Sequence, residues 1–367
     1  MEKIFVTRPA MPEYEEYAEE IKPLWESRWL SNRGVVHKKF EKMLQDYLKC
    51  PNPALFANGH VALEVAINGF DFPAGSEVIT TAYTHCSTTH SIVRNGLTPV
   101  FCDVNSVDYT IDAGLIEAKI TPKTVAIVAT HVYGLCCDVD KIAEIADKHH
   151  LKVIYDAAHA FGVEKDGVGI ASFGDAAMFS CHATKVFHTI EGGITVFKDQ
   201  EMRNKVERLI NFGFISPEEV AYVSTNARMN EFEAAMGICN LRHIDDEIGC
   251  RKVVADQYIE MLGDIPGIRL LRQQPGVKPN FAYFPVFFDG YRKDRNQVQA
   301  ELAQHNVFAR KYFYPLVTDL QCYRGQFASS TQETPRAYQA AESVLALPMY
   351  SGLSPEEVEE ICKIILA

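Results

Sequence analysis

Residues 124–158 read TVAIVATHVYGLCCDVDKIAEIADKHHLKVIYDAA, and this stretch indicates the fold class of the chain. It begins with the β-branched run TVAIVATHVYG (124–134) and ends with a second such run, LKVIYDAA (151–158). Between them, DVDKIAEIADKHH carries apolar residues three and four positions apart, which is the spacing of one helix face. A strand, a helix and a second strand in this order predict a βαβ unit and a parallel sheet.

Further short β-branched runs lie on both sides of this unit. They are EVITTAY (77–83), TPVFCDV (98–104), AAMFSCH (176–182) and GITVF (193–197). Several of the runs are apolar at consecutive positions, as strands are when helices cover both faces of their sheet. The sequence therefore predicts an α/β fold with a mostly parallel sheet, preceded by helices over residues 12–50.

The character of the chain changes from about residue 240. A helix over RKVVADQYIEMLGDI (251–265) is followed by the short runs PGIRLL and YFPVFF, and then by the helical stretches RNQVQAELAQHN and SPEEVEEICKIILA. This order predicts a smaller α+β unit. We therefore expect a large domain over residues 1–245, which includes the N-terminal helices, and a small C-terminal domain over residues 246–367. No Gly/Ser linker separates them, so we expect the two domains to pack tightly.

The composition is that of an ordinary globular protein. Of 367 residues, 47% are hydrophobic and 23% are charged, and the formal net charge is -12 at pH 7. An acidic total argues against nucleic acids and anionic membranes as partners. The N-terminal segment MEKIFVTRPAMPEYEEY lacks the apolar core of a signal peptide, and no run approaches the ~20 apolar residues of a membrane span. We expect a cytoplasmic protein.

The ten cysteines predict neither disulfides nor a metal site. Cys136 and Cys137 are adjacent, and no CxxC pair occurs. Neighbouring cysteines rarely form a disulfide or a tetrahedral metal site. Free cysteine packs as a small hydrophobic residue in a reducing compartment. We therefore expect reduced core thiols and no bound metal.

Two polar residues stand at the ends of strands that are otherwise apolar. Asp156 closes the run LKVIYD, and Lys185 follows AMFSCHAT in FSCHATKVFHTIEGG (179–193). Ligand sites of parallel sheets form outside the carboxyl ends of the strands, so we expect both residues at such a site. The alternatives are that the two residues form a structural salt bridge, or that Lys185 is an ordinary exposed lysine.

Residues suited to a phosphate and a ring are expected at the same place. Gly59 and His60 follow Asn58 in a turn before the helical stretch ALEVAI, and free amides at a helix start suit a phosphate. Ser180 can add a hydroxyl donor, and His85, just after another strand, is a flat side chain that can stack on a ring. A phosphate cradle, a ring platform, a carboxylate and an amine together bind pyridoxal 5′-phosphate (PLP), whose lysine forms a Schiff base and whose ring nitrogen takes an acidic partner.

The chain resembles the sugar-nucleotide aminotransferases of the DegT/StrS family, which have the type I aminotransferase fold. The motifs that carry the resemblance run nearly from end to end: TRPAMP, WLSNRG, ANGHVAL, YTHCSTTH, THVYGLCCDVD, YDAAHAFG, FSCHATKVFHTIEGG, NARMNEFEAAMG and KYFYPL. The spacing of DAAHAFG and HATK…EGG is highly specific. HATKVF, EGG and YFYPL together are most similar to the branch that aminates C4 of a dTDP-4-keto-6-deoxyhexose, which forms dTDP-4-amino-4,6-dideoxyglucose or its C4 epimer.

The resemblance implies catalytic and cofactor-binding roles. Lys185 would carry PLP as an imine, and Asp156 would keep the pyridine nitrogen protonated. His159 would lie near the ring hydroxyl, and His85 would cover the ring face. The residues implied at the cofactor's phosphate are Gly59, His60, Ser180 and, reaching the neighbouring subunit's cofactor, Asn226. A homodimer with shared active sites follows from the last of these contacts.

The substrates implied by the resemblance are a nucleotide sugar and L-glutamate as amino donor. Because the diphosphate of a nucleotide sugar is doubly charged, we expect basic and hydrogen-bonding residues at the mouth of the site. The candidates for substrate contacts are Asn32, Arg33, His188, Arg310, Lys311, Tyr312 and Tyr314. Each of them has an alternative as an ordinary surface or packing residue.

The chain departs from the family pattern at three positions. His60 stands where the family often has threonine, Cys181 replaces a usual aromatic residue, and His188 replaces a common asparagine. The last change lies near the lysine and leaves the exact sugar open. The alternative functions are amination at C3, PLP-dependent sugar dehydration, and non-catalytic binding of a nucleotide sugar on the same fold. Lys185 argues against the dehydratases that act at C3, which have histidine there, and Lys185 with Asp156 argues against a non-catalytic protein.

Overall fold

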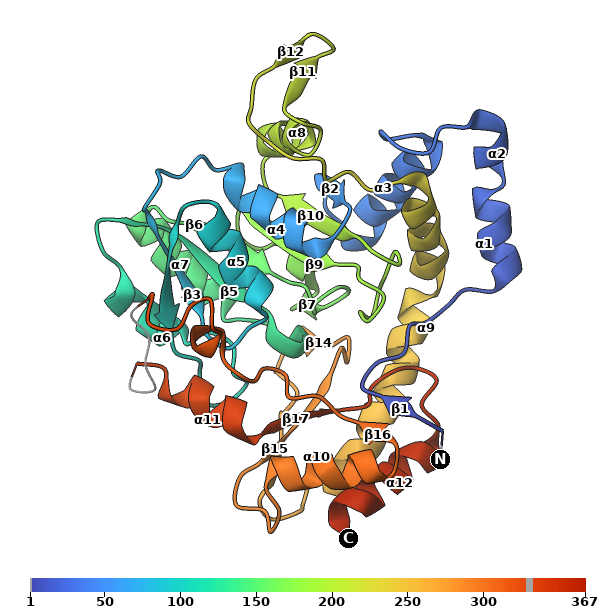
Figure 1. The fold of residues 1–367 in the computed structure, drawn as a ribbon, viewed down its shortest axis with the longest axis vertical. Helices are drawn as coiled ribbons and strands as arrows, with labels where there is room; N and C mark the ends of the chain where they lie inside the picture. Colours follow the sequence, from blue (N-terminus) through green and yellow to red (C-terminus); the bar gives the residue numbers. More distant parts are fainter. Residues whose placement is uncertain (1, 328–332) are drawn as a thin grey trace.

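The computed structural model describes residues 2–327 and 333–367, and a seven-stranded sheet forms its largest layer (Figure 1). The strands, in spatial order, are β2 (Pro53–Phe56), β10 (Gly193–Phe197), β9 (Ala176–Ser180), β6 (Lys152–Asp156), β5 (Thr124–Thr130), β3 (Glu77–Thr81) and β4 (Thr98–Cys102). β10 is antiparallel to both of its neighbours, and the pairs from β9 to β4 are parallel. The prediction of an α/β fold with a mostly parallel sheet is confirmed.

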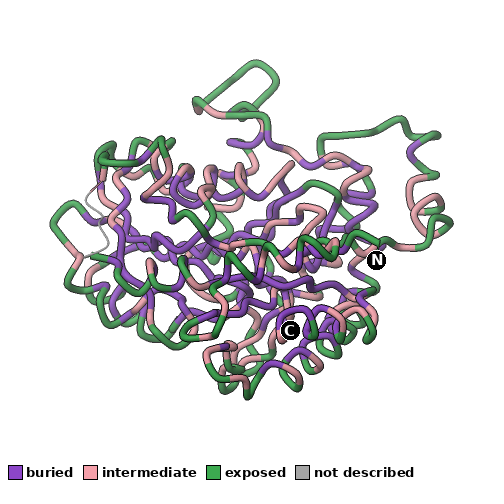
Figure 2. The backbone as a smooth tube through the Cα atoms, turned by 60° about the horizontal axis from the view of Figure 1, so that its bottom comes forward, coloured by how far each residue is buried: buried purple, intermediate pink, exposed green. Residues whose placement is uncertain are grey.

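Helices pack on both faces of this sheet. One face carries α3 (Val35–Leu48), α7 (Val139–His149) and α9 (Glu231–Leu262), and the other carries α4 (Gly59–Asn68), α5 (Cys86–Arg94) and α8 (Gln200–Leu209). Ile127 and Val153 belong to the first core, whereas the next residues along each strand, Val128 and Ile154, belong to the second. Because neighbours along a strand point to opposite faces, a doubly covered strand is apolar at consecutive positions. The buried backbone runs through the middle of the molecule (Figure 2).

All six predicted strands occur, and five of them end two to four residues earlier than predicted. The run predicted to end at residue 134 ends at Thr130, and Tyr133 has a φ of 59° inside the short 3-10 turn that follows. A positive φ does not fit a strand. β2 is not predicted, because its four residues begin with a proline and match no long β-branched run.

A second, antiparallel sheet lies in the C-terminal part of the chain. Its strands are β13 (Ile268–Leu270), β15 (Phe284–Phe288) and β17 (Val344–Leu347). The helices α10 (Arg295–Gln304), α12 (Pro355–Leu366) and the second half of α9 share one apolar core with it. The remaining elements are α1 (Tyr14–Ile21), α2 (Pro23–Ser27), α6 (Ala113–Ile116), α11 (Pro335–Ser343), β1 (Ile4–Phe5), β7 (Glu164–Lys165), β8 (Val168–Gly169), β11 (Phe214–Ser216), β12 (Glu219–Val220), β14 (Val277–Lys278) and β16 (Val307–Phe308).

Helix α9 is longer than predicted. It begins at Glu231, twenty residues before the predicted start at residue 251, so that prediction is wrong. The start is fixed by a capping box, in which the Asn230 side chain accepts from the Glu233 N–H (3.0 Å) and the Glu233 carboxylate accepts from the Asn230 N–H (3.1 Å). The predicted domain boundary between residues 245 and 246 lies inside this helix. The division of the chain at that point stays a prediction.

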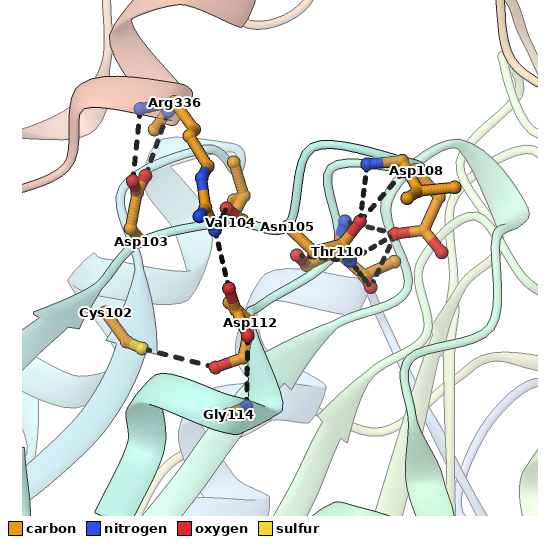
Figure 3. A network of polar contacts seen from close by, with 11 residues as sticks. Cys102, Asp103, Val104, Asn105, Asp108, Thr110, Asp112, Gly114 and Arg336 are labelled. Atoms are coloured by element: carbon orange, nitrogen blue, oxygen red, sulfur yellow. Dashed lines mark hydrogen bonds and ion pairs between the residues drawn. The ribbon is translucent and has the colours of Figure 1, made fainter. Parts of the chain in front are cut away.

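A polar network joins the segment after β4 to the start of α11 (Figure 3). Asp103 is 3% exposed, and its two carboxylate oxygens accept from the backbone N–H groups of Arg336 (3.1 Å) and Ala337 (2.9 Å). The Arg336 guanidinium continues to the Asp112 carboxylate (2.6 Å). The N-cap residue of α11, Thr334, makes no side-chain cap of its own. Asp103 therefore caps this helix from a segment more than two hundred residues away in sequence.

Asp103→Ala is expected to lower the free energy of unfolding by about 2–3 kcal/mol. The change leaves two helix-start amides in a buried place without an acceptor, and lost hydrogen bonds to a charged group are costly. Urea denaturation of the full chain measures the effect. The matched control is Asp140→Ala, because that carboxylate is 72% exposed and pairs only with a lysine at the surface. A loss of less than about 0.5 kcal/mol for Asp103→Ala would contradict its capping role.

The residues that the structure describes contain no membrane-spanning helix, no cluster of metal ligands and no disulfide. Within them, no helix combines the length and the apolar character that a bilayer crossing requires. No three His, Cys, Asp or Glu side chains in the same part of the chain gather closely enough to hold a metal ion. The ten cysteines all lie in this part and are free thiols. Burial raises the pKa of the Cys136 thiol to about 12, which keeps it protonated and unreactive. The predicted cytoplasmic location stays a prediction.

Candidate active site

A cavity of about 590 Å³ lies at the carboxyl ends of three parallel strands. Thr130 ends β5, Asp156 ends β6 and Ser180 ends β9, and all three line the cavity. The first residue of α4, Gly59, and the N-cap residue of α5, His85, line it as well. Two helix starts therefore open onto the place where sheets of this kind bind their ligands.

Eight of the predicted site residues meet in this cavity. They are Gly59, His60, His85, Asp156, His159, Ser180, Lys185 and Tyr312. The other seven do not line it: Asn32, Arg33, His188, Asn226, Arg310, Lys311 and Tyr314. The structure thus brings together seven of the eight predicted cofactor contacts and one of the seven predicted substrate contacts.

Lys185 lies in a closed loop that follows β9. The Cys181 N–H donates to the Gly192 carbonyl (2.8 Å), and the Lys185 N–H donates to the His182 carbonyl (2.9 Å). The Lys185 Nζ donates to the Tyr283 hydroxyl at 3.4 Å and lies 5.7 Å from the centre of that ring. No described carboxylate forms an ion pair with Nζ, so the alternative of a salt bridge between this lysine and Asp156 is not what the structure contains.

Asp156 is 3% exposed and is held by neutral donors. Its Oδ2 accepts from the Thr88 hydroxyl (2.6 Å), and its Oδ1 accepts from the Ala158 N–H (3.1 Å). Thr88 in turn contacts Thr84 (2.8 Å), and Thr84 contacts Thr130 (3.0 Å). Within the described residues no cationic side chain pairs with the carboxylate. A buried carboxylate without a counter-ion is costly, which makes Asp156 a candidate partner for a cationic group of a ligand.

The start of α4 lies directly against β9 and β10 because two glycines allow it. A Cβ on Gly59 would lie 2.8 Å from the Cβ of Ser180, and a Cβ on Gly193 would lie 2.6 Å from the Asn58 carbonyl oxygen. The Asn58 side chain caps the helix by accepting from the Val61 N–H (2.9 Å). The first amides of a helix have no intrahelical acceptor, so the amides of Gly59 and the residue after it can bind an anion in the cavity.

His85 and His159 line the cavity as neutral rings. Burial, and then the nearby Lys185, hold the pKa of His159 well below its usual range. Burial is also the main cause that lowers the pKa of His85, with Lys185 next. The Nδ1 atom of His159 accepts from the Tyr133 N–H (3.0 Å), and that of His85 accepts from the Ser87 N–H (3.2 Å). Both rings are therefore flat, uncharged surfaces in a cavity whose lining also includes the charged residues Asp156, Lys185 and Glu191.

Several residues of the site are missing from the sequence prediction, among them Thr84, Thr88, Tyr283 and Phe313. Thr84 and Thr88 lie in the motif YTHCSTTH, where hydroxyls placed four apart at the start of a helix are a signal that could have identified them. Tyr283 and Phe313 come from the C-terminal part and carry no comparable signal. Their rings lie 4.7 Å and 6.0 Å from the His159 ring, which depends on how that part packs onto the large sheet.

Three predicted residues outside the cavity are held by polar contacts within the chain. Asn32 and Asn226 both accept hydrogen bonds from the Arg228 guanidinium. Arg33 forms an ion pair with Glu41 (2.8 Å), so its charge is already balanced within the chain. The predicted roles of Asn32 and Arg33 at a substrate, and of Asn226 at a neighbouring subunit's cofactor, stay predictions.

The other predicted residues outside the cavity have contacts of their own. The His188 Nε2 lies 2.5 Å from the Ala10 carbonyl, and the imidazole is 2% exposed. The Lys311 Nζ donates to an asparagine side chain of α10 (2.5 Å). Arg310 is exposed, and Tyr314 is 45% exposed. Their roles as substrate contacts stay predictions as well.

The chain is similar to known proteins over nearly its whole length. Residues 12–366 match the DegT/DnrJ/EryC1/StrS aminotransferase family. A dTDP-4-amino-4,6-dideoxy-D-glucose transaminase from Shigella dysenteriae is 40% identical over 367 residues, which are 100% of this chain and 99% of the relative. A protein of the same name from Escherichia coli is 38% identical over 98% of this chain and 97% of its own length. Among solved structures, DesI in the presence of its TDP-sugar product matches with a TM-score of 0.93 at 30% identity, and the match covers 100% of this chain and 92% of that one.

Proposed function

Because the chain belongs to the DegT/DnrJ/EryC1/StrS aminotransferase family, we propose that it is a PLP-dependent transaminase of nucleotide sugars. The proposed reaction moves the amino group of L-glutamate to the C4 ketone of a dTDP-4-keto-6-deoxyhexose, which gives dTDP-4-amino-4,6-dideoxyglucose or its C4 epimer. One observation carries the proposal: the Lys185 amine and the Asp156 carboxylate line one cavity, and neither has an ion-pair partner among the described residues. The names of the relatives from Shigella dysenteriae and Escherichia coli support the choice of C4 and of dTDP.

The residues around the cavity fit PLP. The Lys185 amine can attach the aldehyde, and Asp156 supplies an anion for the ring nitrogen. The amides at the start of α4 and the Ser180 hydroxyl supply donors for the phosphate. The strongest indication of a PLP site is the Asp156 carboxylate, because a buried anion held only by neutral donors is stabilised by a cationic ligand atom. A volume of about 590 Å³ is in the range of small-ligand sites.

The chemistry follows from the two charged residues. When bound, the cofactor supplies a sink for the electrons of the Cα–H bond of glutamate as that bond breaks. Asp156 holds a proton on the ring nitrogen, since an opposite charge nearby favours the protonated form. Once the amino group of glutamate has displaced it from the aldehyde, Lys185 would accept the α-proton on Nζ and return it, because it is the only lysine that lines the cavity among the described residues. The lowered pKa values of His85 and His159 make both of these rings weak bases. The Tyr283 hydroxyl accepts from Nζ and so holds the amine inside the cavity.

The same residues serve both halves of the reaction. After the first half the keto acid would leave, and the amino group would stay with the bound cofactor. Lys185 then moves protons in the opposite direction while the amino group passes to the sugar ketone. Ping-pong kinetics with glutamate and the nucleotide sugar are therefore expected.

Thr88→Val is expected to lower kcat about tenfold with L-glutamate and dTDP-4-keto-6-deoxyglucose. The variant removes the 2.6 Å hydrogen bond to Asp156, and a bond to a charged group contributes about 1.5–3 kcal/mol. The matched control is Thr89→Val on the same helix, since Thr89 is 0% exposed and its hydroxyl has no partner among the described residues. Steady-state kinetics of both variants measure the difference. Equal rates for the two variants would show that Thr88 does not position Asp156.

Product analysis tests the proposed function itself. The protein is incubated with L-glutamate and a panel of 3-keto and 4-keto dTDP-hexoses, and NMR identifies the aminated carbon and its configuration. We expect an amine at C4 only. An amine at C3 would replace the proposed substrate by that of the alternative branch. Absence of any amino sugar, under conditions in which the purified protein carries PLP, would overturn the transaminase proposal.

We also propose that the working unit is a homodimer. The hairpin of β11 and β12 projects from the rest of the molecule (Figure 1). It and the residues just after it expose four apolar side chains, with exposed fractions from 38% to 102%: Phe214, Ile215, Val220 and Val223. Apolar side chains gathered on a protruding segment are typical of a protein contact. Asn226 follows the hairpin, at a position that a contact made by the hairpin would bring to a neighbouring subunit.

Charging the hairpin is expected to weaken this dimer. The double variant Ile215→Asp with Val220→Asp places two carboxylates where the proposed contact is apolar, and the dimer dissociation constant is expected to rise at least tenfold. Sedimentation velocity over a range of protein concentrations measures it. Val107→Asp is the control, because Val107 is 71% exposed and lies in a loop far from the hairpin in sequence. A dimer as tight as the unmodified one would place the contact elsewhere.

A further inference from the structure

His60 links the starts of α4 and α5 at the wall of the cavity. Its Nδ1 lies 2.8 Å from the Ser87 hydroxyl oxygen, and its Nε2 lies 3.6 Å from a carboxylate oxygen of Glu64, one turn further along α4. His60 and Ser87 line the cavity, whereas Glu64 does not. The His60 imidazole therefore lies between the Glu64 carboxylate and the Ser87 hydroxyl, and both His60 and Ser87 line the cavity.

The protonation of His60 sets the direction of the hydrogen bond to Ser87. The Glu64 carboxylate can only accept, so it favours a proton on Nε2 in every state of the ring. In the neutral ring Nδ1 is then the acceptor, and Ser87 uses its single hydroxyl proton to donate to it. In the protonated ring Nδ1 donates to the Ser87 oxygen instead. The hydroxyl proton of Ser87 is then free to donate into the cavity.

Charged and titratable side chains of α4 and α5 surround the His60 ring. From α4, Glu64 faces Nε2 and also pairs with Arg94 of α5 (2.8 Å). From α5, the His90 ring lies 6.4 Å away at an angle of 83°. Burial, followed by the charges of His60 and Arg94, lowers the pKa of His90, and burial lowers that of His85.

The cavity otherwise offers little positive charge to an anion. Among the described residues that line it, Lys185 is the only lysine and there is no arginine. The Lys185 amine is the group proposed to attach the cofactor, so it is not free to neutralise a phosphate. A protonated imidazole at the start of α4 adds a positive charge beside the free helix amides, which is the place that suits a phosphate.

We propose that His60 and Ser87 form a proton-controlled binding site for the phosphate group of the cofactor; this inference rests on the proposed function. With His60 protonated, the pair supplies one positive charge and one hydroxyl donor. With His60 neutral, it supplies neither. The affinity for a phosphate-bearing cofactor therefore falls with rising pH where His60 loses its proton. A threonine, which the family often has here, keeps a hydroxyl but cannot titrate in this range.

The test measures binding of pyridoxamine 5′-phosphate to the full chain freed of cofactor, by isothermal titration calorimetry from pH 6.0 to 8.5. This ligand has no aldehyde, so attachment at Lys185 does not enter. Its phosphate titrates identically with every variant, and only differences between variants count. We expect the dissociation constant of the unmodified protein to rise about tenfold more over this range than that of His60→Thr. Ser87→Ala is expected to bind several-fold more weakly at pH 6.0 and to show a flatter profile.

Glu64→Gln separates a proton switch from a merely structural role of His60. The carboxylate lies 3.6 Å from Nε2 and favours a proton there, so its removal is expected to weaken binding more in the middle of the pH range than at either end. Pyridoxamine without phosphate is the ligand control and is expected to bind the unmodified protein and His60→Thr with the same pH dependence.

The outcomes distinguish the inference from the function on which it rests. Coinciding profiles for the unmodified protein and His60→Thr overturn the proton-controlled site and leave the transaminase proposal standing. Failure of the unmodified protein to bind pyridoxamine 5′-phosphate at any pH overturns the transaminase proposal. If His60→Thr does not fold, His60→Gln takes its place in the comparison with the unmodified protein, because glutamine is polar but cannot take up a proton in this pH range.

Discussion

Lys185→Ala is expected to lower transamination by at least ~10⁴-fold, because the variant lacks both the amine that attaches the cofactor and the base that moves the α-proton. The fold should be retained. The Lys185 Nζ makes one hydrogen bond, at 3.4 Å, and no ion pair with a described residue, so the free energy of unfolding is expected to change by less than about 1 kcal/mol. Turnover with L-glutamate and a dTDP-4-keto-6-deoxyhexose gives the rate, and thermal unfolding checks the fold.

Mass spectrometry locates the attachment directly. Borohydride reduction of the unmodified protein, followed by proteolysis, is expected to leave the cofactor adduct on the peptide that contains Lys185. Lys141→Ala is the matched control, because this lysine is 46% exposed and pairs with Glu144 on the surface of α7. The control should keep the adduct and the full rate. An adduct on another peptide, or a rate for Lys185→Ala within tenfold of the unmodified protein, would reject the assignment of Lys185.

Asp156→Asn is expected to lower kcat/KM about 10²–10⁴-fold. Removal of one charge from a buried pair costs about 3–5 kcal/mol, and each 1.36 kcal/mol is a factor of ten in rate. Asparagine has the shape of aspartate and can keep a hydrogen bond from the Ala158 N–H, so the change isolates the charge. Both half-reactions should slow, since the protonated ring nitrogen serves each of them.

Stopped-flow measurement of the two half-reactions tests this prediction. Glutamate alone reports the first half, and the nucleotide sugar reports the second. Asp140→Asn is the control, because its carboxylate is 72% exposed and lies outside the cavity. Rates of Asp156→Asn within fivefold of the unmodified protein in both halves would argue against the role of the carboxylate at the ring nitrogen.

The sheet and the centre of the site could be predicted because their signals are local. Ile127 and Val128 are neighbours that enter different cores, and this double burial is visible as an unbroken apolar run. Asp156 and Lys185 are visible because a polar residue is unusual at the end of such a run. The resemblance to a family then added His159, which has no local signal of its own, and the structure places it in the same cavity.

The rest depends on contacts between distant parts of the chain. Tyr283 meets Lys185 across 98 positions, and nothing near residue 283 predicts that contact. The charge of Arg33 marks it as a substrate contact in the sequence, yet the fold brings Glu41 beside it.

The wrong start predicted for α9 is a different case, because the signal for the true start is local. The pair Asn230 and Glu233 can be recognised from the sequence as a capping box.

The continuity of α9 bears on how chimeras of such enzymes should be assembled. The first half of the helix gives Ile238 and Ile244 to the core beside the large sheet, and the second half gives Val254 and Tyr258 to the C-terminal core. A recombination junction at residue 245 would therefore join two half-helices whose apolar stripes evolved against different partners. Exchanging residues 231–367 as one block keeps the helix and nearly all of the C-terminal core from a single parent. The contacts that this block makes with the rest of the chain, such as those of Tyr283 with Lys185 and of Arg336 with Asp103, then remain to be matched.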